Sequence, residues 1–433
     1  MGNALDAIKF VWILPYPNSV PFCNEPGEQA NKDATGIMPL ELFTRIANLV
    51  SEQSLNCAII GSEDGIDKHY QLLCNKMGAS VILPVGCKDC SQIEHITFVV
   101  ESDKIDLAEA NIFSSSRIIL RLRRKDLLRL CEIIQILLNN FSDISVRHPD
   151  LLSYSNEDFI IYREQLLKTG RLLLDRKKQW QNYRIDCLTD RFRLDDVQEC
   201  GAGDKSIAIG PDGKLYVCPA VATDSNKTCG DITEGLKLPN SNLFERKYSL
   251  PCSKCEALHC LRCVYLSKLS TFEVCVPSKN ICQIANTELE VQAWLAQEAI
   301  KRELWNDAYN IPVPPTVYDP YEIIRTEDSV AIVHNWHSLV SFSGHPENLK
   351  PSMMLDILHG IQGWSKALLA CIQAEHTPSV DLISRDILAS LRQRTIERYR
   401  DVFFKEDCPT IRQLELLMCK AAEKRSDSSH STY

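Results

Sequence analysis

The chain of 433 residues is long enough for two or three domains of about 100 to 200 residues each. Hydrophobic residues make up 45% and charged residues 24%, a composition that is typical of a globular protein and excludes a fibrous or largely disordered chain. Asp and Glu outnumber Lys and Arg by 57 to 48, which argues against a nucleic-acid partner, since dedicated nucleic-acid binders carry net positive charge. The unusual number is the cysteine count, which is 19.

The first residues favour a cytoplasmic location. Asp6 stands where a secretory signal needs positive charge, and no small-residue cleavage site follows the short apolar run. No stretch reaches the roughly 18 apolar residues of a membrane span, so we expect no membrane partner. Disulfides are rare in the cytoplasm. We therefore expect some of the 19 cysteines to bind a metal or cluster. The alternative is that they serve as small buried hydrophobic residues.

Residues 1–185 alternate short apolar runs with helical patterns. This alternation predicts an α/β fold with parallel strands, a degenerate partial (β/α) barrel. Asn156 is the predicted cap of the last helix. The strands are predicted over residues 8–14, 57–61, 80–83, 96–100, 118–122 and 144–146, and the helices over 40–50, 66–77, 126–138 and 156–173.

A basic run and a cysteine pair stand out within this first region. The run predicts a solvated helix start, and docking of an acidic leader peptide or another subunit is the alternative. The pair, Cys87 and Cys90, supplies two of the four ligands of a metal site, which is weak evidence for one. The residues of the basic run are Arg121, Arg123, Arg124, Lys125 and Arg129.

Residues 186–285 form a second predicted domain, small, Cys-rich and α+β. Ten of the 19 cysteines lie between Cys187 and Cys282. A region so rich in Cys, Gly and Pro needs more than an apolar core to stabilise it. Cysteines elsewhere that lie within apolar patterns are predicted core residues: Cys57, Cys74, Cys131, Cys371 and Cys419.

A β-hairpin is predicted near the start of this domain, with strands over 207–209 and 215–217 and a Gly-containing turn between them. It would place Cys218 close to the segment that holds Cys200. A compact run with two Cys-x-x-Cys pairs follows, and each pair can present two thiolates from one tight turn. Cys275 and Cys282 come after this run, which consists of Cys252, Cys255, Cys260 and Cys263.

The spacing of the compact run excludes two common sites. In a zinc ribbon the two pairs are separated by about 15 to 20 residues, whereas four residues separate them here. The spacing also differs from that of bacterial ferredoxins. Zinc nevertheless remains the alternative to an iron–sulfur cluster.

The C-terminal part is predicted to be helical over residues 286–425. A long helix over 286–309 leads into a proline-rich segment over 310–321, and further helices follow. His334 and His337 are spaced to share one helix face, with His345 nearby, but no Cys or carboxylate completes a metal site. Residues 426–433 are predicted to be a disordered tail.

The cysteine pattern resembles the SPASM domain of radical-SAM peptide-modifying enzymes. In that family a Cys, a Gly and a Cys precede a compact four-cysteine run, and a final Cys follows. Cys200, Gly213 and Cys218 match the first part, and Cys282 is the better final ligand because it precedes the long helix. The later gaps of the compact run are four and two residues here, where the family usually has five and three.

The resemblance implies two auxiliary 4Fe-4S clusters. By position, Cys200, Cys218 and Cys263 would bind the first cluster. Cys187 or Cys229 would complete it, or one iron would stay open. The second cluster would take Cys252, Cys255, Cys260 and Cys282.

The chain lacks the Cys-x3-Cys-x2-Cys motif with which radical-SAM enzymes bind the cluster that cleaves SAM. The loop after the first strand holds Cys23 alone, and we expect a structural role for it. Gly61-Ser62-Glu63 is at best a remnant of the SAM-contacting motif. We therefore expect no SAM and no SAM cleavage on this chain.

The combination resembles the CXXX-repeat peptide maturases, which are radical-SAM-like proteins with a SPASM domain. The supporting segments are VPFCNEPG and CLRCVYLSKLSTFEVCVPSKNIC, and the resemblance covers roughly residues 1–300. It implies a ribosomally synthesised Cys-rich precursor peptide as partner, and a radical-SAM enzyme as a second partner. The expected role is an accessory, electron-relay or substrate-binding factor. The alternative is a peptide-binding scaffold, stabilised by zinc or clusters and without catalytic activity.

Overall fold

The computed structural model describes residues 5–305, apart from short gaps, and three strands between residues 322 and 343. The chain divides into two compact units. The larger contains the described residues up to 237, 256–265 and 280–305, and the smaller contains those of 238–255 and 266–279 and the three strands. The gaps are residues 6, 26–35, 88–89, 91, 107–116, 195–196, 223, 225–226, 239–240, 247–251, 253–254, 256, 272–273, 275–276 and 278.

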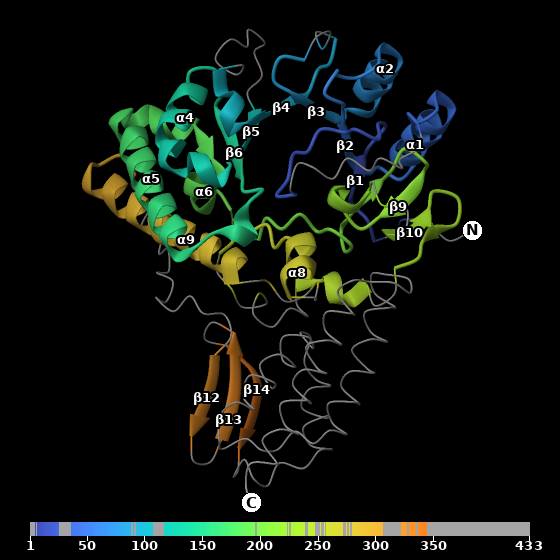
Figure 1. Ribbon diagram of the computed structural model, residues 1–433. Coiled ribbons are helices and arrows are strands. Elements are labelled where there is room, and N and C mark those ends of the chain that lie inside the picture. The colour runs from blue at the N-terminus through green and yellow to red at the C-terminus, as the bar shows by residue number, and fades with distance from the viewer. Residues whose placement is uncertain are drawn as a thin grey trace, which may run out of the picture. The chain divides into compact units, whose positions relative to one another are not determined.

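The larger unit is a mixed α/β fold on one open sheet of 11 strands, in the order β11-β10-β9-β8-β1-β2-β3-β4-β5-β6-β7 (Figure 1). Neighbours from β8 to β7 pair in parallel, and β9, β10 and β11 add antiparallel pairs at one edge. This arrangement is consistent with a partial (β/α) barrel. The strands are β1 (Phe10–Ile13), β2 (Asn56–Ile60), β3 (Ser80–Pro84), β4 (Ile96–Glu101), β5 (Arg117–Arg121), β6 (Asp143–Arg147), β7 (Arg184–Ile185), β8 (Ser206–Ile209), β9 (Lys214–Tyr216), β10 (Thr228–Asp231) and β11 (Gly235–Leu236).

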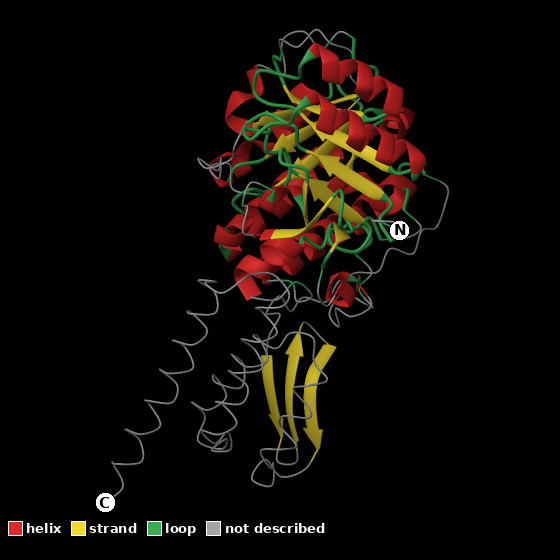
Figure 2. Ribbon diagram, turned by 90° about the vertical axis from the view of Figure 1, so that its right-hand side faces the viewer, coloured by secondary structure: helices red, strands yellow, loops and turns green. Residues whose placement is uncertain are grey.

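Helices lie around the outside of these strands (Figure 2). Strand β2 is a continuous apolar run with four successive buried residues, which shows that both of its faces are covered. The α-helices are α1 (Leu40–Glu52), α2 (Lys68–Met77), α4 (Leu130–Leu137), α5 (Asn156–Asp175), α6 (Asp186–Thr189), α8 (Val264–Thr271) and α9 (Lys279–Lys301). Short 3-10 helices cover Ser102–Lys104, Arg124–Arg129, Leu151–Ser153, Lys177–Asn182, Asp190–Phe192, Pro219–Val221 and Ser241–Phe244.

Helix α9 packs closely against α5. A Cβ atom on Gly170 would lie 2.7 Å from Trp294, so only glycine allows this approach. Tyr162 donates a 2.7 Å hydrogen bond to Glu288, and Asn280 donates to the carbonyl oxygens of Leu151 and Tyr154. These contacts bring the start of α9 to the end of the α/β region.

The predicted strands and helices of residues 1–185 are confirmed in type and order, with two local corrections, and a third correction concerns Cys282 in the next region. Ser155, not Asn156, caps α5, because its side chain accepts the Asp158 N–H in a capping box. The helix predicted over 126–138 begins as a 3-10 turn, and its Cys131 is half-buried instead of a core residue. Cys282 lies inside α9, where the sequence placed it before the helix.

The smaller unit departs from the predicted C-terminal helices. Residues 322–343 form an antiparallel sheet of β12 (Glu322–Thr326), β13 (Ser329–His334) and β14 (His337–Ser343). His334 and His337 are register partners in its second hairpin, so they do not share a helix face. The predicted later helices, the tail 426–433, His345, Cys371 and Cys419 lie outside the described residues.

Among the residues that the structure describes, we find no helix with the length and apolar character that a membrane span requires.

Candidate cysteine site

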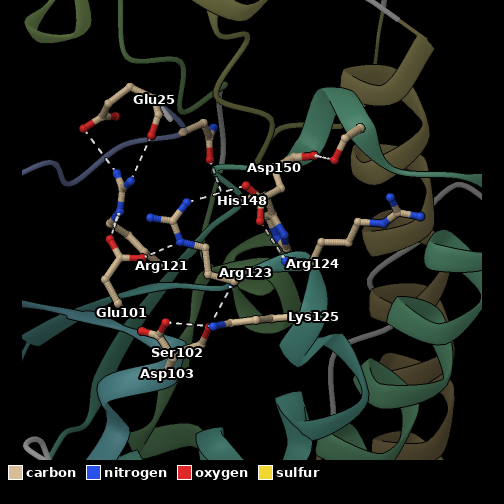
Figure 3. A network of polar contacts seen from close by, with 12 residues as sticks. Glu25, Glu101, Ser102, Asp103, Arg121, Arg123, Arg124, Lys125, His148 and Asp150 are labelled. Carbon is tan, nitrogen blue, oxygen red and sulfur yellow. Dashed lines mark hydrogen bonds and ion pairs between the residues drawn. The ribbon is translucent and has the colours of Figure 1, made fainter. Parts of the chain in front are cut away.

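The loop after β1 is held at the carboxyl ends of β5 and β6. Arg121, the last residue of β5, donates from its two Nη atoms to the carbonyl oxygens of Cys23 (2.8 Å) and Glu25 (2.9 Å). The N–H of His148, just after β6, donates to Asn24 Oδ1 at 2.7 Å. Figure 3 shows Arg121 between Glu25 and Glu101. The loop around Cys23 is therefore fixed by three hydrogen bonds, two to its backbone and one to the side chain of Asn24.

Arg121 is buried with a relative exposure of 0%, so its charge needs close partners. Its guanidinium lies 2.6 Å from Glu101 and 3.2 Å from Glu25. Arg123 shares the Glu101 carboxylate at 2.8 Å. The prediction of a solvated helix start is therefore wrong for Arg121, since this side chain anchors the Cys23 loop.

The rest of the basic run is paired with carboxylates. Each cation lies next to an acidic side chain. Three of these partners are more than 20 residues away along the chain, and the fourth is three residues away. The run thus presents paired charges instead of a free basic face for an acidic peptide. The pairs are Arg123 with Asp150 (3.5 Å), Arg124 with Asp158 (2.9 Å), Lys125 with Asp103 (2.9 Å) and Arg129 with Glu132 (3.1 Å).

The segment that carries Cys200 runs beside the end of the compact cysteine run. Gln198 N–H donates to the Leu258 carbonyl at 2.7 Å, and Cys200 N–H donates to that of Leu261 at 3.5 Å. The largely buried Arg262 and Glu199 form an ion pair at 2.6 Å. These contacts place Cys200 and Cys263 in the same neighbourhood.

The predicted hairpin, formed by β8 and β9, brings Cys218 to the same place. Ala208 pairs with Tyr216 and Ile209 with Leu215, and Gly213 takes a φ of +76° in the turn. Burial raises the pKa of Cys218 well above its ordinary value, and the nearby thiols of Cys263 and Cys200 raise it further. The structure thus brings Cys200, Cys218 and Cys263 together.

Cys23, to which the sequence assigned a structural role, lies within electrostatic range of two of these thiols. Burial raises the pKa of its thiol well above the usual range, and Glu25 and the thiols of Cys200 and Cys263 raise it further. Arg147 at the end of β6 acts in the opposite direction on both Cys23 and Cys200. As whole residues, Cys218 is buried, Cys23 and Cys263 are half-buried, and Cys200 is exposed.

The two cysteines that the sequence offered as the fourth ligand lie in other surroundings. Cys187 is buried in α6, where burial raises its pKa most, and Asp186 and Glu288 raise it further. Its carbonyl oxygen accepts a hydrogen bond from Gln292 at 3.0 Å. Cys229 is buried in β10, where burial raises its pKa to about 12.

A second polar cluster surrounds Cys187. Glu288 accepts from the Tyr162 hydroxyl, and its other oxygen lies 3.1 Å from His259 Nε2. His259 belongs to the compact run, between Cys255 and Cys260, and is buried. The sequence analysis missed this histidine, because only folding brings it against a carboxylate of α9.

The remaining predicted ligands are placed by local contacts. Cys252 and Cys255 form the expected tight turn in the smaller unit, with the Cys255 N–H donating to the Cys252 carbonyl at 3.1 Å. Arg246 donates to the carbonyl oxygens of both. Cys260 and Cys282 belong to the larger unit and are half-buried. Cys275 lies outside the described residues.

We tested whether these residues fit a metal. Within the described parts of the chain, no three His, Cys, Asp or Glu side chains are arranged to hold a single ion. Tetrahedral zinc, with Zn–S bonds of about 2.3 Å, needs sulfur atoms roughly 4 Å apart. Thiolates are ligands of both zinc and iron–sulfur clusters, so the donor type of Cys200, Cys218 and Cys263 suits either group.

Gly61, which the sequence associates with SAM, is explained by packing. A Cβ atom there would lie 2.5 Å from a methyl group of Leu83 on β3 and 3.1 Å from the carbonyl oxygen of Gly65. The next residue, Ser62, donates from its hydroxyl to the same carbonyl in a tight turn. These contacts require a glycine whether or not a ligand binds.

No protein-family model and no curated protein matches the chain. Among solved structures, the chain is similar to SuiB of Streptococcus suis, whose crystal structure contains its precursor peptide SuiA. The match has 14% sequence identity and a TM-score of 0.36 and covers 52% of this chain. It spans 62% of SuiB, less than two thirds of that protein's length.

Proposed function

We propose that this protein is an iron–sulfur SPASM-type factor in the maturation of a ribosomally synthesised, Cys-rich CXXX-repeat peptide. It acts beside a radical-SAM enzyme, as an electron relay or substrate-binding partner. The observation that supports this proposal is the proximity of Cys200 and Cys263 to Cys218. These are the cysteines that the SPASM resemblance assigns to one cluster.

The surroundings of these thiols support cluster binding. Burial keeps Cys218 in its neutral form, so metal binding must remove its proton. Arg147 and Arg262 lie close enough to lower the pKa of Cys200 against the effect of burial. The same cations would offset the negative charge of thiolates gathered around a cluster.

The loop after β1 supports an accessory role. One cysteine cannot bind the cluster that cleaves SAM, and this loop contains Cys23 alone. Arg121 also holds the loop closed against the ends of β4 and β5. The proposed role therefore leaves SAM cleavage to a partner enzyme.

Metal analysis tests the proposal. Anaerobically purified protein should contain about eight iron and eight sulfide per chain and absorb near 400 nm, as two 4Fe-4S clusters require. Zinc at about two equivalents, without that absorption, would overturn the cluster assignment.

The second candidate function is a peptide-binding scaffold, and the half-buried Cys260 separates it from electron relay. In a relay, Cys260→Ala abolishes peptide modification by the partner enzyme but leaves peptide binding intact. Loss of binding as well favours the scaffold. Cys131→Ala, which changes a half-buried cysteine on α4, is the matched control for both assays.

A further inference from the structure

We propose that residues 19–25, in the loop after β1, occupy a peptide-binding site of this protein from within, and that the site takes an extended peptide with an aromatic, an amide and a carboxylate side chain. We call this segment the strap. In α/β proteins ligands bind at the carboxyl ends of parallel strands, so a segment that covers these ends stands where a ligand is expected. The inference goes beyond the proposed function and does not require a bound metal.

The strap crosses the carboxyl ends of the strands from β2 to β6. At one end the Val20 N–H donates to the carbonyl oxygen of Gly61, just after β2, at 2.8 Å. At the other end the N–H of His148, just after β6, donates to Asn24 Oδ1 at 2.7 Å. Arg121, the last residue of β5, donates to two further carbonyl oxygens of the strap. The strap is therefore bound at the ends of three strands.

Three side chains of the strap make contacts by which a peptide can be recognised. The ring of the buried Phe22 lies 5.0 Å from that of Trp12 on β1. The amide oxygen of Asn24 accepts a backbone hydrogen bond. The Glu25 carboxylate lies 3.2 Å from the buried guanidinium of Arg121 (Figure 3). The order Phe-x-Asn-Glu therefore describes the kind of peptide that fits this place.

The strap carboxylate leaves part of its hydrogen-bonding capacity unused. Glu25 Oε1 accepts the Phe22 N–H at 2.8 Å and also faces Arg121. Its Oε2 is buried and has no hydrogen-bond partner among the residues that the structure describes. Burial raises the pKa of this carboxyl, and Arg121 acts against that rise. Because a buried acceptor without a partner costs free energy, a carboxylate bound through both oxygens would fit the site better.

Arg121 is placed to bind such a carboxylate when the strap leaves. Its Nε donates to Glu101 at 2.6 Å, and Glu101 belongs to β4 and not to the strap, so the guanidinium keeps its position. The two Nη atoms now bind carbonyl oxygens of the strap and would become available. Two parallel N–H groups of an arginine bind both oxygens of a carboxylate. The site is thus preformed in the sheet.

The strap acts as an autoinhibitory segment in this arrangement. A segment tethered next to its site competes at an effective concentration in the millimolar range. A free peptide should therefore bind wild-type protein weakly, and weakening of the strap should strengthen its binding.

The test uses a synthetic peptide of sequence VPFSNE, which copies residues 20–25 with Ser in place of the cysteine. It is acetylated and amidated, so that the Glu side chain is its only carboxylate, and a second peptide has Gln in place of this Glu. Isothermal titration calorimetry measures the binding of each peptide to wild-type protein and to the double variant Asn24→Ala/Glu25→Gln, in which the strap is weakened. Glu132→Gln is the matched control, because Glu132 is exposed in a surface pair with Arg129.

The Glu peptide should bind the strap variant at least about tenfold more tightly than it binds wild-type protein or the control. The Gln peptide should bind the strap variant at least about tenfold more weakly than the Glu peptide does. Equal affinity of the three proteins for the Glu peptide, or of the strap variant for the two peptides, would overturn the inference and leave the proposed function standing.

A measurement on wild-type protein covers the case in which the strap variant does not fold. Cys23 lies within the strap and is half-buried, so its rate of alkylation reports opening of the strap. A millimolar excess of the Glu peptide should raise this rate at least about tenfold, because it holds the strap open. The buried Cys74 is the internal control. An unchanged rate at Cys23, or an equal rise with the Gln peptide, would contradict displacement of the strap.

Discussion

The parallel sheet β1–β6 and the cysteine segments around Cys200 and Cys263 are stabilised in different ways. The sheet is stabilised by apolar side chains buried on both faces, and its strands follow one another in chain order. The cysteine segments are joined by two backbone hydrogen bonds and the ion pair of Arg262 with Glu199. The proposed function therefore predicts that the second region depends on a bound group and the first does not.

Cluster removal should separate the two regions most strongly. Structural metal sites contribute on the order of 10 kcal/mol of folding free energy in small domains, so chelation should loosen the segments 197–205 and 257–263. Hydrogen exchange should accelerate there by more than about 100-fold, while the amides of β2 to β5 stay protected. Equal protection of both regions in the chelated protein would contradict this difference.

Substitution of Arg121 should weaken the connection between the sheet and the Cys23 loop. Arg121→Met leaves Glu25 without its buried cation and Glu101 with Arg123 alone, which should cost about 3 to 5 kcal/mol in urea unfolding. Arg117→Met is the matched control, because Arg117 is more than half exposed in its pair with Asp143 and its loss should cost no more than about 1 kcal/mol. Equal losses for the two variants would show that Arg121 does not anchor the loop.

Acidification should destabilise the sheet end that carries the loop. Burial lowers the pKa of His148 to about 3. In the unfolded chain His148 binds a proton near pH 6.5, whereas in the folded chain it stays neutral down to about pH 3. The free energy of unfolding therefore falls as the pH drops from about 6.5 toward 3. Between pH 7 and 5 the loss from this group is about 2 kcal/mol. His148→Gln should remove this part of the pH slope, and an unchanged slope would exclude His148 as its cause.

The polar cluster beside Cys187 should show the smallest effect. Tyr162→Phe keeps the ring but removes the hydrogen bond to Glu288, which should cost about 1 to 3 kcal/mol in thermal or urea unfolding. The iron content should not change, because the buried Cys187 lies in other surroundings than Cys200, Cys218 and Cys263. Loss of iron in this variant would place Cys187 among the ligands.

Local sequence patterns predicted the fold where apolar residues follow one another regularly. A run of four apolar residues identified β2, and the Gly-containing turn identified the β8–β9 hairpin. The sequence analysis did not predict the strands over 322–343, because it assigned the whole of residues 286–425 to a helical region. Ser155 was missed as a cap because two capping residue types stand next to each other.

Only the part of the candidate site that follows from the spacing of its cysteines was predicted. The sequence singled out Cys200, Cys218 and Cys263 through their motif, and the structure brings them together. It could not place the loop that holds Cys23, because the position of this loop depends on a hydrogen bond from Arg121, nearly 100 residues away. A lone cysteine next to a buried arginine leaves no pattern in the sequence.

Mössbauer spectroscopy of protein purified anaerobically from cells grown on ⁵⁷Fe tests the central claim most directly. The account predicts that nearly all the iron is present as 4Fe-4S clusters, at about eight iron atoms per chain. Protein that binds zinc instead, or that contains no cluster iron after anaerobic purification, would contradict it.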